Sequence, residues 1–168
     1  MANTIQTHMK NNTLPLVHFF LAFIMLLIGG TLGLLQGLNR GGVFELPASF
    51  NYYEVLTLHG ILLILSFTTL FTNGYLYAAI RHTLGELSKT VKILAWSSLA
   101  SFLIGSVLVV WMVLAGEATV MYTFYPPMQA SPWFYIGLVF VVLCIWLAGL
   151  GVFISAFQWK RRNKGQHL

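Results

Sequence analysis

His59 lies inside a long apolar segment, residues 52–80, where an ionisable side chain is costly and usually has a function. A neutral imidazole within a membrane helix can hydrogen-bond to a polar neighbour, or it can bind a metal through a ring nitrogen. The residue type alone does not separate these two roles. His59 is therefore either a packed histidine or a metal ligand, and other features of the chain must distinguish them.

A line of polar side chains runs along the same segment. At about 100° per residue, five of them fall within roughly 40° of one line along a helix: Tyr52, His59, Ser66, Asn73 and Tyr77. Polar groups that faced lipid would lack partners, so the stripe should face a bundle interior, a cofactor or internal water. We therefore expect His59 to point inward, roughly 10 Å below the outer end of its helix.

The composition identifies the surroundings of these residues. Hydrophobic residues make up 58% of the chain, charged residues 8%, and the mean hydropathy is +0.79, which is typical of an integral membrane protein. A helix needs roughly 20 apolar residues to cross the hydrocarbon core. Four stretches meet this requirement, at about residues 14–38, 52–80, 91–115 and 133–159. The sequence predicts a single all-α membrane domain, with polar tails at 1–13 and 160–168.

The distribution of basic residues predicts how these helices are oriented. Lysine and arginine are concentrated before the first span, around the second connection and after the fourth span: Lys10, Arg81, Lys89, Lys92, Lys160, Arg161, Arg162 and Lys164. The other side has only Arg40. By the positive-inside rule both termini are cytoplasmic. The net charge of +5 then reflects this topology and not a surface for nucleic acid.

Small residues predict where helices pack closely. They recur at every fourth position in two spans: Gly29, Gly33 and Gly37 in the first, and Ser97, Ser101 and Gly105 in the third. Such stripes let helix backbones approach each other, so both are expected to be packing faces. Cys144 is the single cysteine, and it cannot form a disulfide within the chain. We expect it to be an inert apolar filler in the fourth span.

The connection between the third and fourth spans is unusually apolar for a loop. Residues 116–128 read Gly-Glu-Ala-Thr-Val-Met-Tyr-Thr-Phe-Tyr-Pro-Pro-Met, with one acid, three aromatic side chains and no lysine or arginine. Pro126 and Pro127 favour an extended path. We expect this loop to fold over the outer end of the helices.

Two segments resemble subunit I of the heme-copper terminal oxidases, most closely the B-type branch of the cytochrome c oxidases. The first is Tyr-Tyr-Glu-Val-Leu-Thr-Leu-His-Gly at 52–60, followed by Phe-Thr-Thr-Leu-Phe at 67–71, and the second is the loop at 117–127. The resemblance extends from about residue 14 to 162 with the same helix order. It implies that the chain is similar to the first four helices of subunit I, and that His59 is an axial ligand of the low-spin haem.

The resemblance also implies what this chain lacks. In the family, later helices provide the second axial histidine, the ligand of the high-spin haem, and the histidines and cross-linked tyrosine of the copper centre. The other four histidines do not match those positions: His8, His18, His82 and His167. The chain is thus similar to the N-terminal third of subunit I. A high-spin haem and copper are expected only in the missing part, and the chain alone is expected not to be catalytic.

His18 and His59 cannot both bind one iron. His18 lies near the inner end of its span and His59 lies below the outer end of the next, so their depths differ by roughly 14 Å. Two axial nitrogens on one iron are only about 4 Å apart. Either a second axial histidine comes from another chain, or the haem is bound weakly or not at all.

Three hypotheses remain open. In the first, the chain is part of a respiratory oxidase in the plasma membrane of a prokaryote, partnered by the remaining helices or subunits, with cytochrome c or quinol as electron donor. In the second, it is a haem-binding homodimer without enzymatic activity, with two His59 residues on one haem. In the third, it is a cofactor-free helical membrane protein, an assembly partner or a remnant. None of the three involves nucleic acid.

Overall fold

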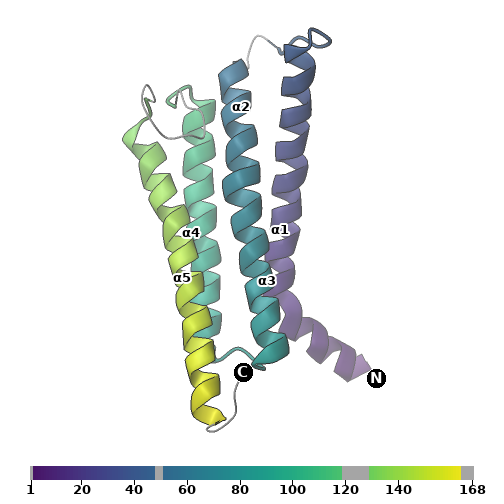
Figure 1. The fold of residues 1–168 in the computed structure, drawn as a ribbon, viewed down its shortest axis with the longest axis vertical. Helices are drawn as coiled ribbons and strands as arrows, with labels where there is room; N and C mark the ends of the chain where they lie inside the picture. The colour runs from purple at the N-terminus through teal and green to yellow at the C-terminus, as the bar shows by residue number, and fades with distance from the viewer. Residues whose placement is uncertain (1, 48–50, 119–128, 164–168) are drawn as a thin grey trace.

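The computed structural model describes residues 2–47, 51–118 and 129–163, with side chains from Thr13 onward. The elements in chain order are α1 (Ala2–Arg40), α2 (Tyr52–Gly60), the π-helix η1 (Ile61–Phe67), α3 (Thr68–Thr83), α4 (Lys89–Leu114) and α5 (Pro132–Arg162). α2, η1 and α3 follow one another without a break and form one rod (Figure 1). The predicted all-α fold is therefore confirmed for the described residues.

Four helical stretches are long and apolar enough to cross a membrane. They are Thr13–Arg40, Tyr52–Thr83, Lys89–Leu114 and Pro132–Arg162. Each contains one of the four spans expected from the sequence, apart from a residue or so at the edges.

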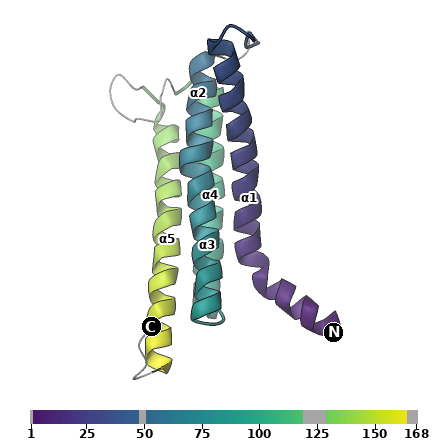
Figure 2. The same cartoon turned by 45° about the vertical axis from the view of Figure 1, so that its right-hand side comes forward.

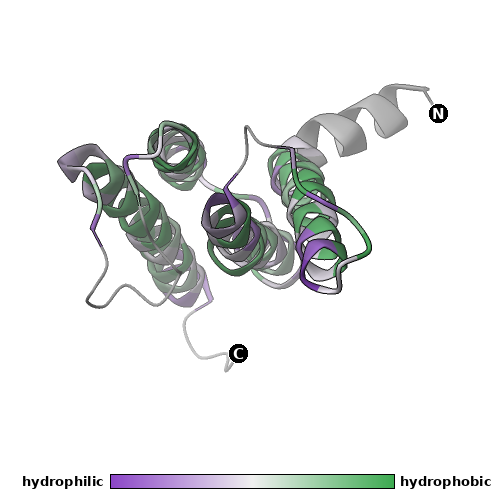
Figure 3. Ribbon diagram, turned by 90° about the horizontal axis from the view of Figure 1, so that it is seen from above, coloured by the Kyte–Doolittle hydropathy of each residue, from purple (hydrophilic) through white to green (hydrophobic). Residues whose placement is uncertain are grey.

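The four rods stand side by side in an open arrangement. α1 packs on the rod formed by α2, η1 and α3, α4 packs on α5, and the rod also contacts both α4 and α5. Seen from above, α1 and α5 lie at opposite sides of this group (Figure 3). Many large apolar side chains of the outer helices are consequently exposed, among them Phe20, Leu27, Trp146 and Phe153. In a membrane these faces meet lipid or further protein.

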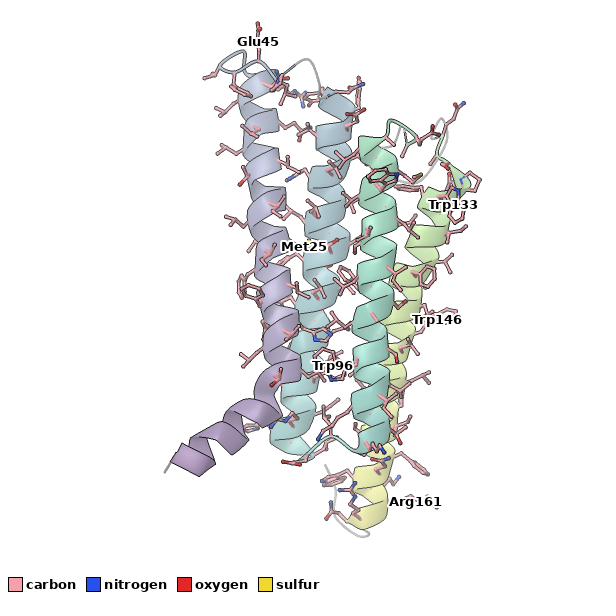
Figure 4. All side chains as sticks on the ribbon, turned by 180° about the vertical axis from the view of Figure 1, so that it is seen from behind. Met25, Glu45, Trp96, Trp133, Trp146 and Arg161 are labelled. Carbon is pink, nitrogen blue, oxygen red and sulfur yellow. The ribbon has the colours of Figure 1, made fainter. Side chains whose placement is uncertain are left out.

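Basic side chains gather at one end of the molecule. Arg161, at the end of α5, and Glu45, after α1, are labelled at opposite ends in Figure 4. The end of α3 and the beginning of α4 lie at the same end as Arg161, and they carry Arg81, Lys89 and Lys92. We call this end the basic end. The N-terminal part of α1 turns away from the other helices there (Figure 2), and Pro15 lies inside α1, where proline removes a backbone hydrogen bond and permits a kink.

Local signals in the sequence determine where the helices begin. Asn51 accepts a hydrogen bond from the backbone N–H of Tyr53, and Glu54 accepts one from the N–H of Asn51, which forms a capping box for α2. Ser88 caps α4, and Pro132 occupies the first turn of α5. The capping box matters for function because it determines where the turns that carry His59 begin.

α4 and α5 approach each other closely at a pair of glycines. A Cβ added to Gly105 would lie 2.5 Å from the carbonyl oxygen of Gly137. Next to this crossing the hydroxyl of Ser101 donates to the carbonyl of Phe140 at 2.7 Å. The small-residue face predicted for the third span is therefore confirmed at Ser101 and Gly105.

The same prediction is wrong for Ser97, which is exposed. The buried serine is its neighbour Ser98, whose hydroxyl donates to the carbonyl of Cys144 at 2.9 Å. The physical reason is the helix period: a strict repeat of four residues drifts off a face that follows 3.6 residues per turn.

Cys144 has more polar contacts than the apolar filler that we expected. Its sulfur lies 3.4 Å from the side-chain nitrogen of Asn73, which donates to it, and 3.2 Å from the hydroxyl oxygen of Ser98. The three residues come from α5, α3 and α4. Cys144 therefore connects three helices through weak hydrogen bonds.

The polar stripe of the second span faces protein over most of its length. Ser66, Asn73 and Tyr77 are 3%, 4% and 0% exposed, so their inward orientation is confirmed. Tyr52 and His59, nearer the other end, are half-buried.

The close contact of α4 with α5 can be tested with two glycines. Gly105→Ala should lower the free energy of unfolding of the purified chain by about 1–3 kcal/mol, and with it the melting temperature, because the new methyl group must push Gly137 away. Gly149→Ala is the control, since a Cβ on Gly149 meets nothing within 4 Å. Thermal melts in one detergent compare the two variants. Equal melting temperatures would mean that the Gly105 contact does not stabilise the fold.

Candidate functional site

The backbone around His59 orients its ring. Nδ1 of His59 lies 2.7 Å from the carbonyl oxygen of Gly29 in α1. A carbonyl oxygen can only accept, so Nδ1 must carry the proton of this hydrogen bond. In the neutral ring Nε2 then has a free lone pair. The imidazole is thus in the tautomer that can bind a metal through Nε2.

Gly33 provides the space that the ring occupies. A Cβ at position 33 would lie 2.4 Å from Cε1 and 2.6 Å from Nδ1 of His59, which is too close for any side chain. Gly29, one turn away, has Leu63 and Leu62 against it. A Cβ on Gly37 would meet nothing within 4 Å. The glycine stripe of the first span therefore packs at Gly29 and Gly33 and not at Gly37.

The π-helix η1 begins immediately after the turn that carries His59. It covers Ile61–Phe67 and packs on α1. A π-helix holds more residues per turn than an α-helix, and such segments are frequent at functional sites. Sequence analysis did not predict η1, because its Ile-Leu-Leu-Ile-Leu-Ser-Phe run reads equally well as α-helix.

Apolar side chains fill the bundle beside His59. Leu58 and Ile61 lie in one cluster with Val109 and Val113 of α4 and Phe134 of α5. Glu54, the acidic side chain nearest in sequence, accepts the hydrogen bond of the capping box. Leu58 and Ile61 of the His59 helix therefore face α4 and α5, whereas the imidazole itself packs on Gly29 and Gly33 of α1.

His18 forms a separate site near the basic end. Its ring is fully buried, and its Nδ1 donates to the carbonyl of Leu14 at 2.9 Å. His18 packs against Gly74, whereas His59 packs against Gly33. Positions 18 and 33 of α1 are roughly 22 Å apart at about 1.5 Å per residue. This separation exceeds the sequence-based estimate, and it agrees with the conclusion that the two histidines cannot bind the same iron.

The described residues offer a single imidazole to a metal at the His59 site. Within them, no group of three or more His, Cys, Asp or Glu side chains could hold a metal ion. The predicted cover over the outer end of the helices falls on residues 119–128, which lie outside the described part. At its base the backbone N–H of Ser131 donates to the carbonyl of Glu117 at 2.8 Å.

Three comparisons relate this chain to known proteins. The family described as cytochrome c and quinol oxidase polypeptide I matches residues 13–168. Cytochrome c oxidase subunit 1 of Thermus thermophilus is 37% identical over 155 residues, which cover 87% of this chain and 27% of the relative. A cryo-EM structure of a heme-copper terminal oxidase dimer matches with a TM-score of 0.84 at 32% identity, over 95% of this chain and 28% of that chain.

The relatives are much longer than this chain, which spans about a quarter of their length. The match includes the helix that carries His59 and the four helices capable of crossing a membrane. With this coverage, the chain belongs to the cytochrome c and quinol oxidase polypeptide I family as a multi-pass membrane protein that corresponds to the N-terminal part of subunit I.

Proposed function

We propose that His59 supplies one axial ligand to the low-spin haem of a respiratory heme-copper oxidase. The hydrogen bond from Nδ1 to the Gly29 carbonyl is the observation that carries this proposal. Metal-binding histidines almost always donate their other ring N–H to a carbonyl, a carboxylate or water, which fixes the tautomer and the ring orientation. Family membership and the inward polar stripe support the same role.

The residues of this chain would hold and tune the haem. Gly29 fixes the direction of the ring, and Gly33 leaves room for it. When bound, the haem supplies one-electron transfer. The axial ligand, burial and nearby hydrogen bonds are the means by which a protein sets the potential of that step.

The complete reaction requires more protein than this chain. In the proposed oxidase, the second axial ligand, the high-spin haem and the copper come from the remaining helices or subunits. The electron donor is cytochrome c or quinol, and the complex lies in the plasma membrane of a prokaryote. Identification of every chain in the native complex, purified in mild detergent, tests this assignment. A partner that carries further membrane spans is expected.

We also propose that both termini are cytoplasmic. Arg81, Lys89, Lys92 and Arg161 lie at the basic end, and Glu45 lies at the opposite end. Positively charged connections stay on the cytoplasmic side of membranes. The basic end is therefore the cytoplasmic end in this proposal.

Replacement of His59 tests its role as a ligand. In the assembled complex, His59→Ala should abolish the visible spectrum of the low-spin haem, because no other described histidine lies near Gly33. His18→Ala should leave that spectrum intact. Haem that appears only with partner chains supports the oxidase, a symmetric low-spin haem in the isolated chain indicates the homodimer, and no haem in any preparation indicates the cofactor-free protein. A normal spectrum in His59→Ala would refute the assignment.

Gly33 offers a second test that leaves His59 in place. Gly33→Ala should weaken haem binding by about 10–100-fold, as changes to the residues that support a metal ligand commonly do, because the methyl group displaces the ring from the Gly29 carbonyl. Gly37→Ala is the matched control on the same helix face and should bind haem as the unmodified protein does. Haem titration of the assembled complex, monitored by absorbance, measures both variants. Equal affinities would show that the position of the ring does not depend on Gly33.

Cysteine labelling tests the orientation. Glu45→Cys should react with an impermeant maleimide added outside cells, and Glu86→Cys should react only after the membrane is opened. The native Cys144 is buried and should contribute no background. If Glu86→Cys reacted from outside and Glu45→Cys did not, the basic end would lie outside the cell and the proposed topology would be wrong.

A further inference from the structure

Two polar atoms are buried together near the basic end without a hydrogen-bond partner among the described residues. They are Nε2 of His18 and the hydroxyl oxygen of Tyr77, and both side chains are 0% exposed. The two rings meet edge to face, with centroids 5.3 Å apart and an angle of 66° between their planes. Buried polar atoms in proteins nearly always have a partner, so this pair requires an explanation.

The two atoms are complementary. Because Nδ1 of His18 donates to the Leu14 carbonyl, Nε2 of the neutral ring is an acceptor that lacks a donor. The Tyr77 hydroxyl has a proton to donate and can also accept. The rings touch, but the two polar atoms do not form a direct hydrogen bond.

No hydrogen bond among the described residues satisfies either atom. The polar side chain beside the Tyr77 hydroxyl is that of Ser98, which donates its own proton to the carbonyl of Cys144. Tyr77 packs in an apolar cluster with Leu14, Val91, Ala95 and Ala148. Asn73, one turn before Tyr77, donates its side-chain N–H to the sulfur of Cys144. A small polar molecule that donates to Nε2 and accepts from Tyr77 would satisfy both.

We propose that one internal water molecule bridges His18 and Tyr77. It donates one O–H to Nε2 of His18 and accepts the O–H of Tyr77, and two to four polar partners are usual for a buried water. Apolar cavities stay dry, but the two rings in contact here each carry a buried polar atom without a hydrogen bond. The water would join α1 to α3, as the bond between His59 and Gly29 joins α1 to α2.

A pocket at the basic end lies near the proposed site. A pocket of about 230 Å³ lies between α1, α3 and α4, with Arg81, Glu86 and Lys92 among its lining residues. Leu14 also lines the pocket, and its carbonyl oxygen accepts the hydrogen bond from His18. Leu14 therefore lies between the pocket and the His18 ring.

Nuclear magnetic resonance of the full chain in bicelles tests the proposal without haem. With selective labelling of histidine and tyrosine, cross-relaxation with water should appear on the ring protons of both His18 and Tyr77, and the ¹⁵N shift of Nε2 should be that of a hydrogen-bonded acceptor. Tyr77→Phe should remove the water signal from His18. Tyr75→Phe is the matched control on the same helix, because Tyr75 is 62% exposed, and it should change neither signal.

Either of two results in the unmodified chain would overturn the proposal. A hydrogen-bonded Nε2 without water cross-relaxation would mean that Tyr77 donates directly to His18. The shift of a free acceptor would mean that the pair is dry and unbonded. Both readings come from the unmodified chain, so a variant that fails to fold does not affect them. A failed assignment of His59 as haem ligand would leave this measurement unchanged.

Discussion

A polar group in the hydrocarbon interior must find its partner within the protein, and this constraint explains how the two histidines of the membrane spans are oriented. Each imidazole is oriented by a backbone carbonyl of α1: His59 by Gly29 and His18 by Leu14. Helical carbonyls keep a second lone pair after forming their own backbone bond, so they can accept a ring N–H without breaking the helix. In each neutral ring Nε2 is therefore left as an acceptor that can bind a proton donor or a metal.

The two sites differ in what can approach that nitrogen. His59 is half-buried, so its ring keeps some accessible surface for a larger ligand. His18 is fully buried beneath Tyr77, and only a very small molecule could reach it. The same hydrogen-bond geometry would thus serve the proposed haem in one place and the proposed water in the other.

The sequence predicted the helices well because membrane spans are encoded by hydrophobic length, which requires no tertiary information. The polar stripe was also predictable for Ser66, Asn73 and Tyr77, since a lipid-facing polar group is unfavourable.

The predictions fail where the contact between two neighbouring helices determines which side chain is buried. Ser97 and Ser98 are equivalent in type, and only the crossing with α5 decides which is buried. Gly33 had the spacing of a packing glycine, but the imidazole that occupies its space comes from a different helix. The amino-acid composition of η1 does not distinguish a π-helix from an α-helix.

One axial nitrogen per chain has a consequence for assembly in the proposed oxidase. A haem held by His59 alone would gain little affinity, whereas a haem held also by a second histidine joins two pieces of protein, and its binding free energy then stabilises their association. The exposed apolar faces of α1 and α5 provide area for that association but no directional contact. The hydrogen bond from Nδ1 to Gly29 would fix the direction of this contact, because it orients the ring and therefore the lone pair of Nε2 that would bind the iron. Cofactor binding and the docking of the remaining helices would therefore be coupled, and the carbonyl of Gly29 would contribute to both.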